Sequence, residues 1–450
     1  MKVKFLGAAG TVTGSSYILT SGSGTSILID MGMFQGTQEI EKLNYLPYEY
    51  DCRMITDAVL THAHLDHCGR LPVAVNKGFN GKIYMTPPTR DLTELSLLDS
   101  AQIAINDGKK ILYDRGLAQR TIDRFKTVGY HEPFRAGDFK VTFRDAGHIV
   151  GSASLEIEDL QPDSEIRKIV FSGDLGNTPE DLVKPTEFFS EADAVVMEST
   201  YGDRLHPEED AVTMLQEEIN AIEWTDSTLL IPAFALERTQ EILNMIMHLK
   251  RAGRVRQETP VYLDSPMAEK ATMIYLSHLD MLNEHIHRDL EETGSPFGFP
   301  GLEVVHKRGH SMALHKHSGA KVIIAGSGMM TGGRIVSHAA FYLRDPNTRL
   351  MIVGYQGEGT LGRQLMEGAK EVVIENEVVS VRATITVTHA LSSHADQDAL
   401  LDWVGHIRGV RKLFLTHGED SSRTALQQRI IKDLGISDVT LPVLNQEVTL

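Results

Sequence analysis

The sequence predicts an α/β protein with two domains, one of which is inserted into the other. The chain has 450 residues, more than one hydrophobic core usually supports. Residues 1–201 show short strand patterns separated by turn glycines, whereas residues 202–382 alternate strand, loop and helix. After residue 382 the first pattern returns. We therefore expect a first domain built from residues 1–201 and 383–450, and an inserted domain over residues 202–382.

The first part is rich in short apolar or alternating segments bounded by glycine and polar turn residues, the pattern of half-buried strands. One longer pattern with helical spacing separates them, over Thr89–Ile105. The predicted strands are Val3–Leu6, Ser16–Leu19, Ser26–Asp30, Val59–Leu60, Ile83–Met85, Phe139–Arg144, Ser152–Ile157, Lys168–Ser172 and Ala194–Met197.

The inserted part alternates buried strands with helices, which predicts a parallel sheet flanked by helices. Its predicted strands are Thr228–Ile231, Val261–Leu263, Val322–Ala325 and Arg349–Val353, and its predicted helices are Glu237–Lys250, Met267–Leu276 and one from Arg334. In the C-terminal part we expect strands at Ala383–Val387 and Lys412–Leu415 and a helix over Gln397–Ile407.

Bulk composition is that of a globular protein, with 42% hydrophobic and 23% charged residues. No apolar stretch reaches membrane-spanning length, and the N-terminus shows no signal-peptide core. Two cysteines, Cys52 and Cys68, provide no disulfide framework. We therefore expect a cytoplasmic protein without a membrane partner.

The net charge of −17 disfavours long-range attraction of polyanions. If the substrate is a nucleic acid, attraction has to come from a local basic patch and from bound metal ions.

The most informative segment is Thr61-His62-Ala63-His64-Leu65-Asp66-His67, which directly follows the buried strand ending at Leu60. Imidazole and carboxylate are the ligands that zinc prefers, and four of them on one loop can serve two ions. The loop therefore predicts a dinuclear metal site.

Further candidate ligands follow other strands. His148 and Asp174 each come after a strand and next to a glycine that lets the backbone turn inward. His417 repeats this arrangement near the C-terminus. A strand-end aspartate is often only a turn former, but the shared position of these residues indicates ligands.

These motifs, in this order, resemble those of the metallo-β-lactamase superfamily. Asp30 matches the acidic residue that ends an early strand in that family. Four further segments, Met197–Gly202, Ile231–Glu241, Gly326–Arg334 and Ser392–Asp396, resemble the β-CASP subgroup of nucleases. The likeness covers essentially the whole chain and is greatest to pre-mRNA 3′-end processing endonucleases and their prokaryotic ribonuclease relatives. It implies an αββα sandwich with an inserted β-CASP domain.

The resemblance also implies a ligand set. One zinc ion would be held by His62, His64 and His148, and a second by Asp66, His67 and His417, with Asp174 bridging them. Asp30 would fix the tautomer of a ligand imidazole. Manganese or iron remains an alternative metal.

The implied reaction is hydrolysis of RNA by a two-metal hydroxide mechanism, endonucleolytic or also 5′-exonucleolytic, that leaves 5′-phosphate and 3′-hydroxyl ends. His394 would be the general acid, Glu198 would hold it, and Asp66 would act beside them as a catalytic ligand.

RNA phosphates are expected at Ser392, Ser393, Gly333, Arg334 and Arg363, since backbone amides and arginines suit phosphate. The basic run Lys250–Arg256 is a second candidate, although such runs are more often solvated helix ends. Gly357–Gly362 also matches G-x-G-x-x-G, a weak sign of dinucleotide binding.

Other functions stay open. The same metals could hydrolyse DNA, a lactam or a thioester, and a catalytically silent RNA-binding subunit is a non-enzymatic alternative. RNA is favoured because RNA-acting members of the family carry histidine at the position of His417. The sequence leaves open whether the protein is a homodimer.

Overall fold

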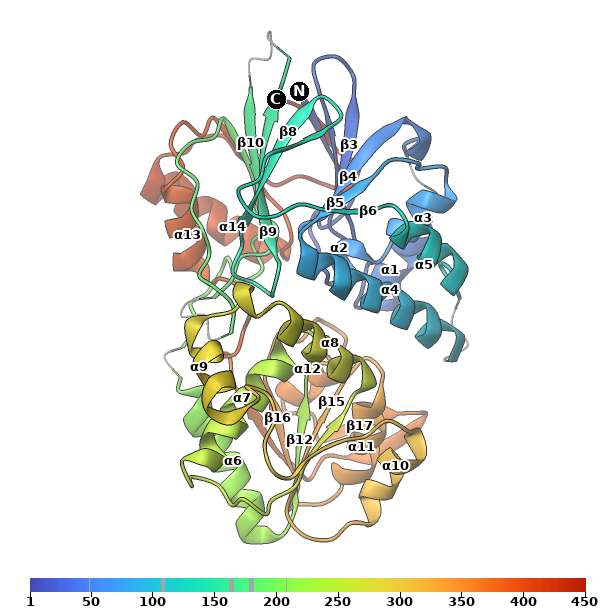
Figure 1. The fold of residues 1–450 in the computed structure, drawn as a ribbon, viewed down its shortest axis with the longest axis vertical. Coiled ribbons are helices and arrows are strands. Elements are labelled where there is room, and N and C mark those ends of the chain that lie inside the picture. The colour runs from blue at the N-terminus through green and yellow to red at the C-terminus, as the bar shows by residue number, and fades with distance from the viewer. Residues whose placement is uncertain (48, 107–109, 162–165, 178–181, 208) are drawn as a thin grey trace. The chain divides into compact units, whose positions relative to one another are not determined.

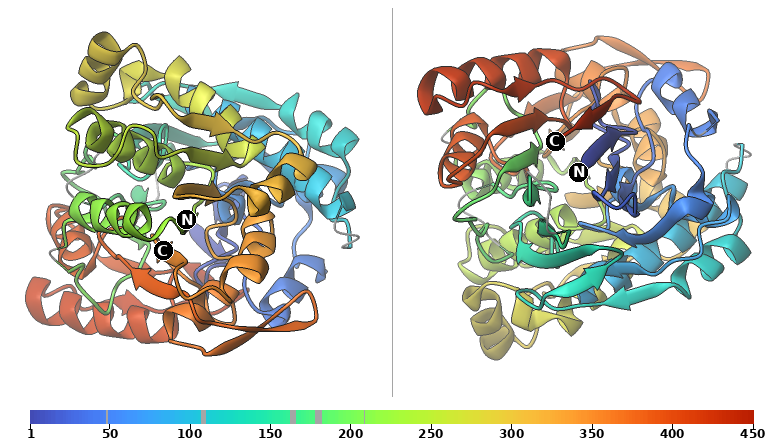
Figure 2. Two further views of the ribbon diagram at one scale, coloured as in Figure 1. Left: turned by 90° about the horizontal axis from the view of Figure 1, so that it is seen from below. Right: turned by 90° about the horizontal axis from the view of Figure 1, so that it is seen from above.

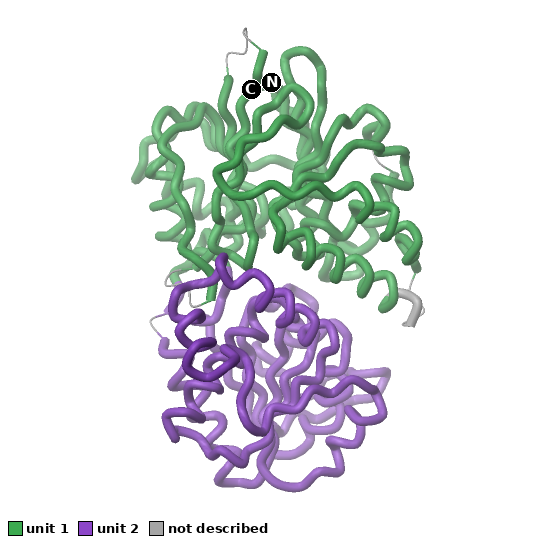
Figure 3. Tube along the Cα trace, viewed as in Figure 1, with its two compact units in different colours: residues 1–205, 394–450 green, residues 206–393 purple. Residues whose placement is uncertain are grey.

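The computed structural model describes residues 1–450 apart from 48, 107–109, 162–165, 178–181 and 208. The chain forms two compact units (Figure 3): residues 1–205 with 394–450 make unit 1, and residues 206–393 make unit 2. Unit 2 is therefore an insertion into the sequence of unit 1. Its limits lie later in the chain than the boundaries expected after residues 201 and 382.

The described part of unit 1 contains two seven-stranded sheets (Figure 1). The first has the order β22 (Glu447–Thr449), β1 (Lys2–Phe5), β2 (Ser16–Thr20), β3 (Ser26–Met31), β4 (Ile55–Val59), β5 (Ile83–Met85) and β6 (Phe125–Thr127). The second has the order β21 (Val439–Thr440), β20 (Lys412–Leu415), β11 (Ala194–Met197), β10 (Lys168–Phe171), β9 (Ala153–Asp159), β8 (Phe139–Asp145) and β7 (Phe134–Ala136).

Three buried clusters show that these sheets form the middle of a four-layer sandwich. Side chains such as Phe5, Leu19, Phe143 and Phe414 pack between the two sheets. The other face of the first sheet packs against helices through residues such as Leu97. The outer face of the second sheet packs against helices through Trp403, Leu400 and Leu426. The predicted αββα order of layers is confirmed.

Helices of unit 1 cover these two outer faces. They are α1 (Gln38–Lys42), α2 (Leu65–Cys68), α3 (Leu71–Asn76), α4 (Pro87–Asn106), α5 (Arg115–Ile122), α13 (Gln397–Gly405) and α14 (Asp420–Arg429), with short 3₁₀ turns η1 (Leu43–Tyr45) and η2 (Cys52–Met54) and a π turn η5 (Ile430–Leu434). The two chain ends lie side by side (Figure 2), because β1 pairs with β22.

Unit 2 is built on a sheet of parallel strands with the order β14 (Leu302–Val304), β13 (Val261–Asp264), β15 (Lys321–Ala325), β12 (Thr228–Pro232), β16 (Arg349–Ile352) and β19 (Thr384–Val387). One face of this sheet packs on residues such as Ile335, Leu343 and Leu365. The parallel sheet predicted for the inserted domain is confirmed.

The helices of unit 2 connect these strands. They are α6 (Ala211–Thr225), α7 (Arg238–Arg251), α8 (Pro266–Ser277), α9 (Glu284–Thr293), α10 (Arg308–Ala313), α11 (Arg334–Tyr342) and α12 (Leu361–Met366), with 3₁₀ turns η3 (Leu279–Met281) and η4 (Leu314–Lys316). A separate hairpin joins β17 (Glu371–Ile374) and β18 (Glu377–Ser380).

One element lies elsewhere than expected. We predicted that the strand at 383–387 begins the C-terminal part of the first domain, but β19 pairs with β16 in the sheet of unit 2. A strand pattern in the sequence identifies an extended segment but does not identify the strand with which it pairs. Only the observed pairing shows to which unit β19 belongs. Among the described residues, no helix has the length and apolarity required to cross a membrane.

Candidate metal centre

Every predicted ligand follows the end of a strand in unit 1. His62 and His64 follow β4, His148 follows β8, Asp174 follows β10 and His417 follows β20. Beside two of them, Gly147 and Gly173 have φ angles of +67° and +59°. Glycine adopts this left-handed conformation without steric cost, which allows the chain to turn directly after the strand. Both of these glycine turns were predicted from the sequence.

The first group of donor atoms consists of three imidazoles and one carboxylate. His62 Nε2 and His148 Nε2 each lie 3.1 Å from His64 Nδ1. Asp174 Oδ2 lies 3.5 Å from His62 Nε2 and 3.7 Å from His148 Nε2. All four side chains thus present a donor atom to one small volume.

The second group shares the same aspartate. His67 Nε2 lies 3.2 Å from Asp174 Oδ1, and His417 Nε2 lies 3.7 Å from that oxygen. Asp66 Oδ2 lies 3.3 Å from His417 Nε2. Asp174 therefore directs Oδ2 towards the first group and Oδ1 towards the second. The structure therefore places the sequence-predicted ligands in two neighbouring groups, and a third group of donor atoms combines Asp174 and His417 with His394. The assignment of these residues as ligands remains a prediction.

The spacing of these atoms fits a divalent metal. Zinc bonds of 2.0–2.2 Å at tetrahedral angles separate neighbouring ligand atoms by about 3.3–3.6 Å. The observed separations are close to this. In addition, His67 Nε2 and Asp174 Oδ1 are buried and make no hydrogen bond within the described structure. Buried polar atoms normally have a partner, and a cation would satisfy both.

The protonation states of four ligands suit metal binding, whereas that of His67 does not. Burial lowers the pKa of His67, but the charges and hydrogen bonds of Asp174 and Asp30 outweigh burial and raise it well above its usual value, so a bound metal would have to displace a proton there. Burial lowers the pKa of His62 well below its usual value and that of His64 to about 4, so both imidazoles are neutral at pH 7. Burial raises the pKa of Asp66, but the hydrogen bond and charge of His417 outweigh this effect and lower it to about 2. The neighbouring histidines likewise hold the pKa of Asp174 well below its usual value. Neutral imidazole and ionised carboxylate are the ligand forms that metals require.

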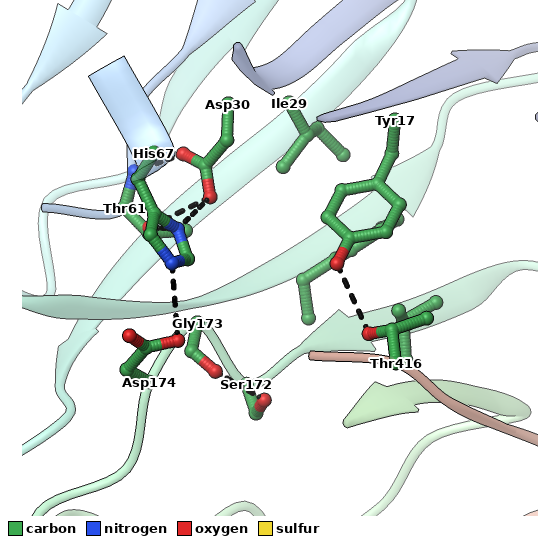
Figure 4. A pocket seen from close by; sticks show the side chains of 11 residues that line it. Tyr17, Ile29, Asp30, Thr61, His67, Ser172, Gly173, Asp174 and Thr416 are labelled. Atoms are coloured by element: carbon green, nitrogen blue, oxygen red, sulfur yellow. Dashed lines mark hydrogen bonds and ion pairs between the residues drawn. The ribbon is translucent and has the colours of Figure 1, made fainter. Parts of the chain in front are cut away.

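Asp30 and Thr61 orient two ligand imidazoles through hydrogen bonds at Nδ1, and Figure 4 shows them next to His67. Asp30 Oδ2 accepts a hydrogen bond from His67 Nδ1 at 2.8 Å, which leaves Nε2 directed at the donor cluster. The same carboxylate accepts from the backbone N–H and the hydroxyl of Thr61, both at 2.8 Å. Since the hydroxyl proton of Thr61 is used in this way, its oxygen can accept from His62 Nδ1 at 3.1 Å. These hydrogen bonds at Nδ1 direct Nε2 of both His67 and His62 towards the donor cluster.

His394 and Glu198 form a second functional pair beside this cluster. His394 Nδ1 lies 3.1 Å from Glu198 Oε1, and Glu198 is fully buried while 16% of the His394 side chain is exposed. Burial lowers the pKa of His394, but the charge of Glu198 and its hydrogen bond outweigh burial and raise the pKa to about 9. His394 therefore holds a proton at neutral pH. Its ring packs at 4.6 Å from that of His148 and 5.7 Å from that of His417.

Thr200 connects this pair to the metal ligands. Its hydroxyl donates to Glu198 Oε2 at 2.6 Å and can accept from His417 Nδ1 at 3.1 Å. Sequence reasoning did not select Thr61 or Thr200. Their positions in the sequence could have identified them, because Thr61 directly precedes His62 and Thr200 closely follows Glu198. A threonine hydroxyl can donate to a carboxylate and accept from an imidazole at the same time.

The residues predicted to hold RNA phosphates have partners of their own in unit 2. Arg334 forms an ion pair with Asp264 and donates to the carbonyls of Val305 and His306. Arg363 pairs with Glu367 at 2.5 Å, and Ser393 accepts a hydrogen bond from Arg238. Ser392 is buried, and Gly333 precedes α11 with a φ of +74°. Phosphate binding by these five residues remains a prediction.

Three family matches cover most of the chain. Residues 9–200 match the metallo-beta-lactamase superfamily, residues 239–365 the Beta-Casp domain, and residues 378–442 the Zn-dependent metallo-hydrolase RNA specificity domain. Ribonuclease TTHA0252 of Thermus thermophilus is 36% identical over 427 residues, which cover 95% of both chains. The chain belongs to the β-CASP ribonuclease family of the metallo-β-lactamase superfamily.

Other relatives agree with this membership. An RNase J-like protein of Methanocaldococcus jannaschii is 32% identical over 91% of both chains. Transcription termination factor FttA of Methanosarcina mazei is 33% identical over 97% of this chain and 70% of its own. For the fold alone, a crystal structure of an Enterococcus faecalis protein of unknown function is similar, with a TM-score of 0.55 at 14% identity, covering 100% of this chain and 99% of its own. Membership and the donor cluster together support binding of a divalent metal.

Proposed function

We propose that this protein is a zinc-dependent ribonuclease that hydrolyses RNA phosphodiester bonds and leaves 5′-phosphate and 3′-hydroxyl ends. The observation that supports the proposal is that the two oxygens of Asp174 lie near two groups of donor atoms, Oδ2 near the first and Oδ1 near the second, with the protonated His394 next to them. Two adjacent metal sites with a neighbouring acid are what in-line displacement at phosphorus requires.

In this proposal one zinc ion would be held by His62, His64 and His148 and a second by Asp66, His67 and His417, and Asp174 would serve both sites. When bound, the ions supply a water molecule of lowered pKa and positive charge beside the scissile phosphate. Manganese or iron in the same positions would supply the same chemistry.

The chain itself orients the ligands and moves the proton. Asp30, Thr61 and Thr200 keep His67, His62 and His417 in the tautomers that present Nε2. Because Glu198 engages His394 Nδ1, Nε2 is the nitrogen that would protonate the leaving 3′-oxygen of the ribose. Without that proton the departing oxygen would leave as an alkoxide, which is a much poorer leaving group.

The domain assignment belongs to the same proposal: a hydrolase domain that begins with residues 1–201, and a β-CASP domain inserted from residue 202. The expected end of the insertion at residue 382 is moved beyond β19, because this strand pairs in the sheet of unit 2. A homodimer and a cytoplasmic location remain predictions.

The decisive experiment offers 5′-labelled and internally labelled RNA and DNA of equal length to the zinc-loaded protein. Internal cuts in RNA alone are expected, with products that carry a 5′-phosphate. Release of mononucleotides from the 5′ end would add an exonuclease activity. Turnover of the lactam nitrocefin or of a thioester, with no cleavage of either nucleic acid, would refute the proposal, and cleavage of DNA alone would change its substrate.

A further inference from the structure

A long stretch of unit 2 lacks acidic residues altogether. Residues 304–344 contain no aspartate or glutamate, although the whole chain has 61 such residues and a net charge of −17. The stretch contains the cations Lys307, Arg308, Lys316, Lys321, Arg334 and Arg344, together with five histidines. The local charge is therefore opposite in sign to that of the chain.

The start of this stretch lies at the carboxyl end of the parallel sheet. Residues 305–307 leave β14 and lead into α10, while residues 326–333 leave β15. Arg334 joins the two segments, because its guanidinium bonds to the carbonyls of Val305 and His306 and to Asp264 at the end of β13. Ligands of open α/β sheets bind outside the carboxyl ends of the strands.

The cations of the stretch fall into two classes. Arg334 and Arg344 pair with Asp264 and Glu377, and Lys321 donates to the carbonyl of His317. In contrast, Lys307, Arg308 and Lys316 are exposed and lie within ion-pair distance of no acid among the residues that the structure describes. Nearby, His310 is also exposed, and Glu269 lies 3.2 Å from His306.

The basic run Lys250–Arg256 offers a contrast in the same unit. Lys250 is buried and donates to the carbonyls of Gln257 and Thr259. Arg251 pairs with Glu292, and Arg256 lies 3.8 Å from Glu223. Most of this run is therefore neutralised within the protein, and it is the weaker candidate for binding an anion.

We propose that the exposed segment His306–His310 is a binding surface for the phosphate backbone of single-stranded RNA, with Lys307 and Arg308 as its phosphate contacts. This inference rests on the proposed ribonuclease function. It identifies a local basic surface that could attract RNA to a chain of net charge −17. Paired Arg334 has a positioning role in it, because it fixes the backbone from which Lys307 extends.

The test compares two double variants, Lys307→Gln with Arg308→Gln and, as the matched control, Arg251→Gln with Arg256→Gln. Each removes two surface arginine or lysine charges from unit 2. Binding of a fluorescent single-stranded RNA to zinc-loaded protein is followed by anisotropy over a range of salt concentrations. All proteins also carry His394→Ala to slow cleavage, and gel electrophoresis verifies that the probe is intact.

Each phosphate contact contributes about 0.7 to the slope of log K against log salt for a single strand, so loss of two should reduce the slope by about 1.4 and weaken binding about 10–30-fold near 0.1 M salt. The control should keep the slope of the parent. An unchanged slope in Lys307→Gln/Arg308→Gln, with RNA still bound, overturns this inference and leaves the proposed function intact. A parent protein that binds no RNA overturns both.

Discussion

Glu198→Gln removes the charge that keeps His394 protonated and preserves the shape of the side chain. Glu198 is fully buried and 3.1 Å from His394 Nδ1. At this distance and an effective dielectric constant of about 20, the attraction is ~5 kcal/mol, or ~4 pKa units. Burial of the imidazolium offsets part of this, which accords with a pKa of about 9. Because burial is the same in the variant, we expect Glu198→Gln to lower the pKa of His394 by about 4 units.

The primary assay is an NMR titration of the histidine resonances of metal-free protein. Stability provides a second readout. A raised pKa in the folded state stabilises the protein fully below the unfolded value of 6.5, and this stabilisation is lost as the pH rises through about 9. Glu198→Gln should therefore reduce the free energy of unfolding by about 2 kcal/mol at pH 7, and the difference should vanish above the folded pKa.

Activity of the zinc-loaded enzyme should follow the same sign. Since His394 acts in its protonated form, a lower pKa moves the alkaline decline of kcat to lower pH, and kcat at pH 7 should fall about 10–100-fold. Glu187→Gln is the matched control, because Glu187 lies equally close to the exposed His131, 3.1 Å away on the surface, and should leave the His394 titration unchanged. A His394 that still titrates near pH 9 in Glu198→Gln would refute the assignment of Glu198.

Three further outcomes are expected. Metal analysis after repletion should approach two zinc ions per chain, and Asp174→Asn should weaken both sites because each group uses one oxygen of Asp174; a wild-type stoichiometry fixed at one would exclude the bridging role. His394→Ala should slow RNA cleavage by about 10²–10⁴-fold with zinc content unchanged, whereas loss of zinc would make His394 a ligand. Thr200→Val should lower kcat and alter the imidazole nitrogen shifts of His417, while Thr200→Ser, which keeps the hydroxyl, should restore both; equal effects of the two variants would show that the methyl group and not the hydroxyl matters.

The local part of the fold followed from residue patterns. Alternating segments predicted β8 and β9 within a residue or two, and the strands at Ile83–Met85, Ala194–Met197 and Lys412–Leu415 have the predicted bounds. The β17–β18 hairpin was not predicted, because its apolar residues are consecutive and do not alternate with polar ones. Helix α14 was not predicted, because it has too few apolar residues to set a period. The pairing of β19 with the sheet of unit 2 was also beyond a single sequence, since strand partners are chosen by long-range packing.

By itself, the sequence determined the chemistry of the site: which imidazoles and carboxylates the chain offers, that each follows a strand, and through their motifs the family. The type of a ligand and its position at the end of a strand are local properties, so they can be read from the order of residues in the chain. Only the tertiary structure decided which oxygen of Asp174 faces which group, and that Thr61 and Thr200 link carboxylates to imidazoles. It also separated free cations from paired ones: Arg334 is held by Asp264, whereas Lys307 and Arg308 stay exposed. The sequence shows which residues are charged, but whether a charge is neutralised depends on distances between residues that are remote in the chain.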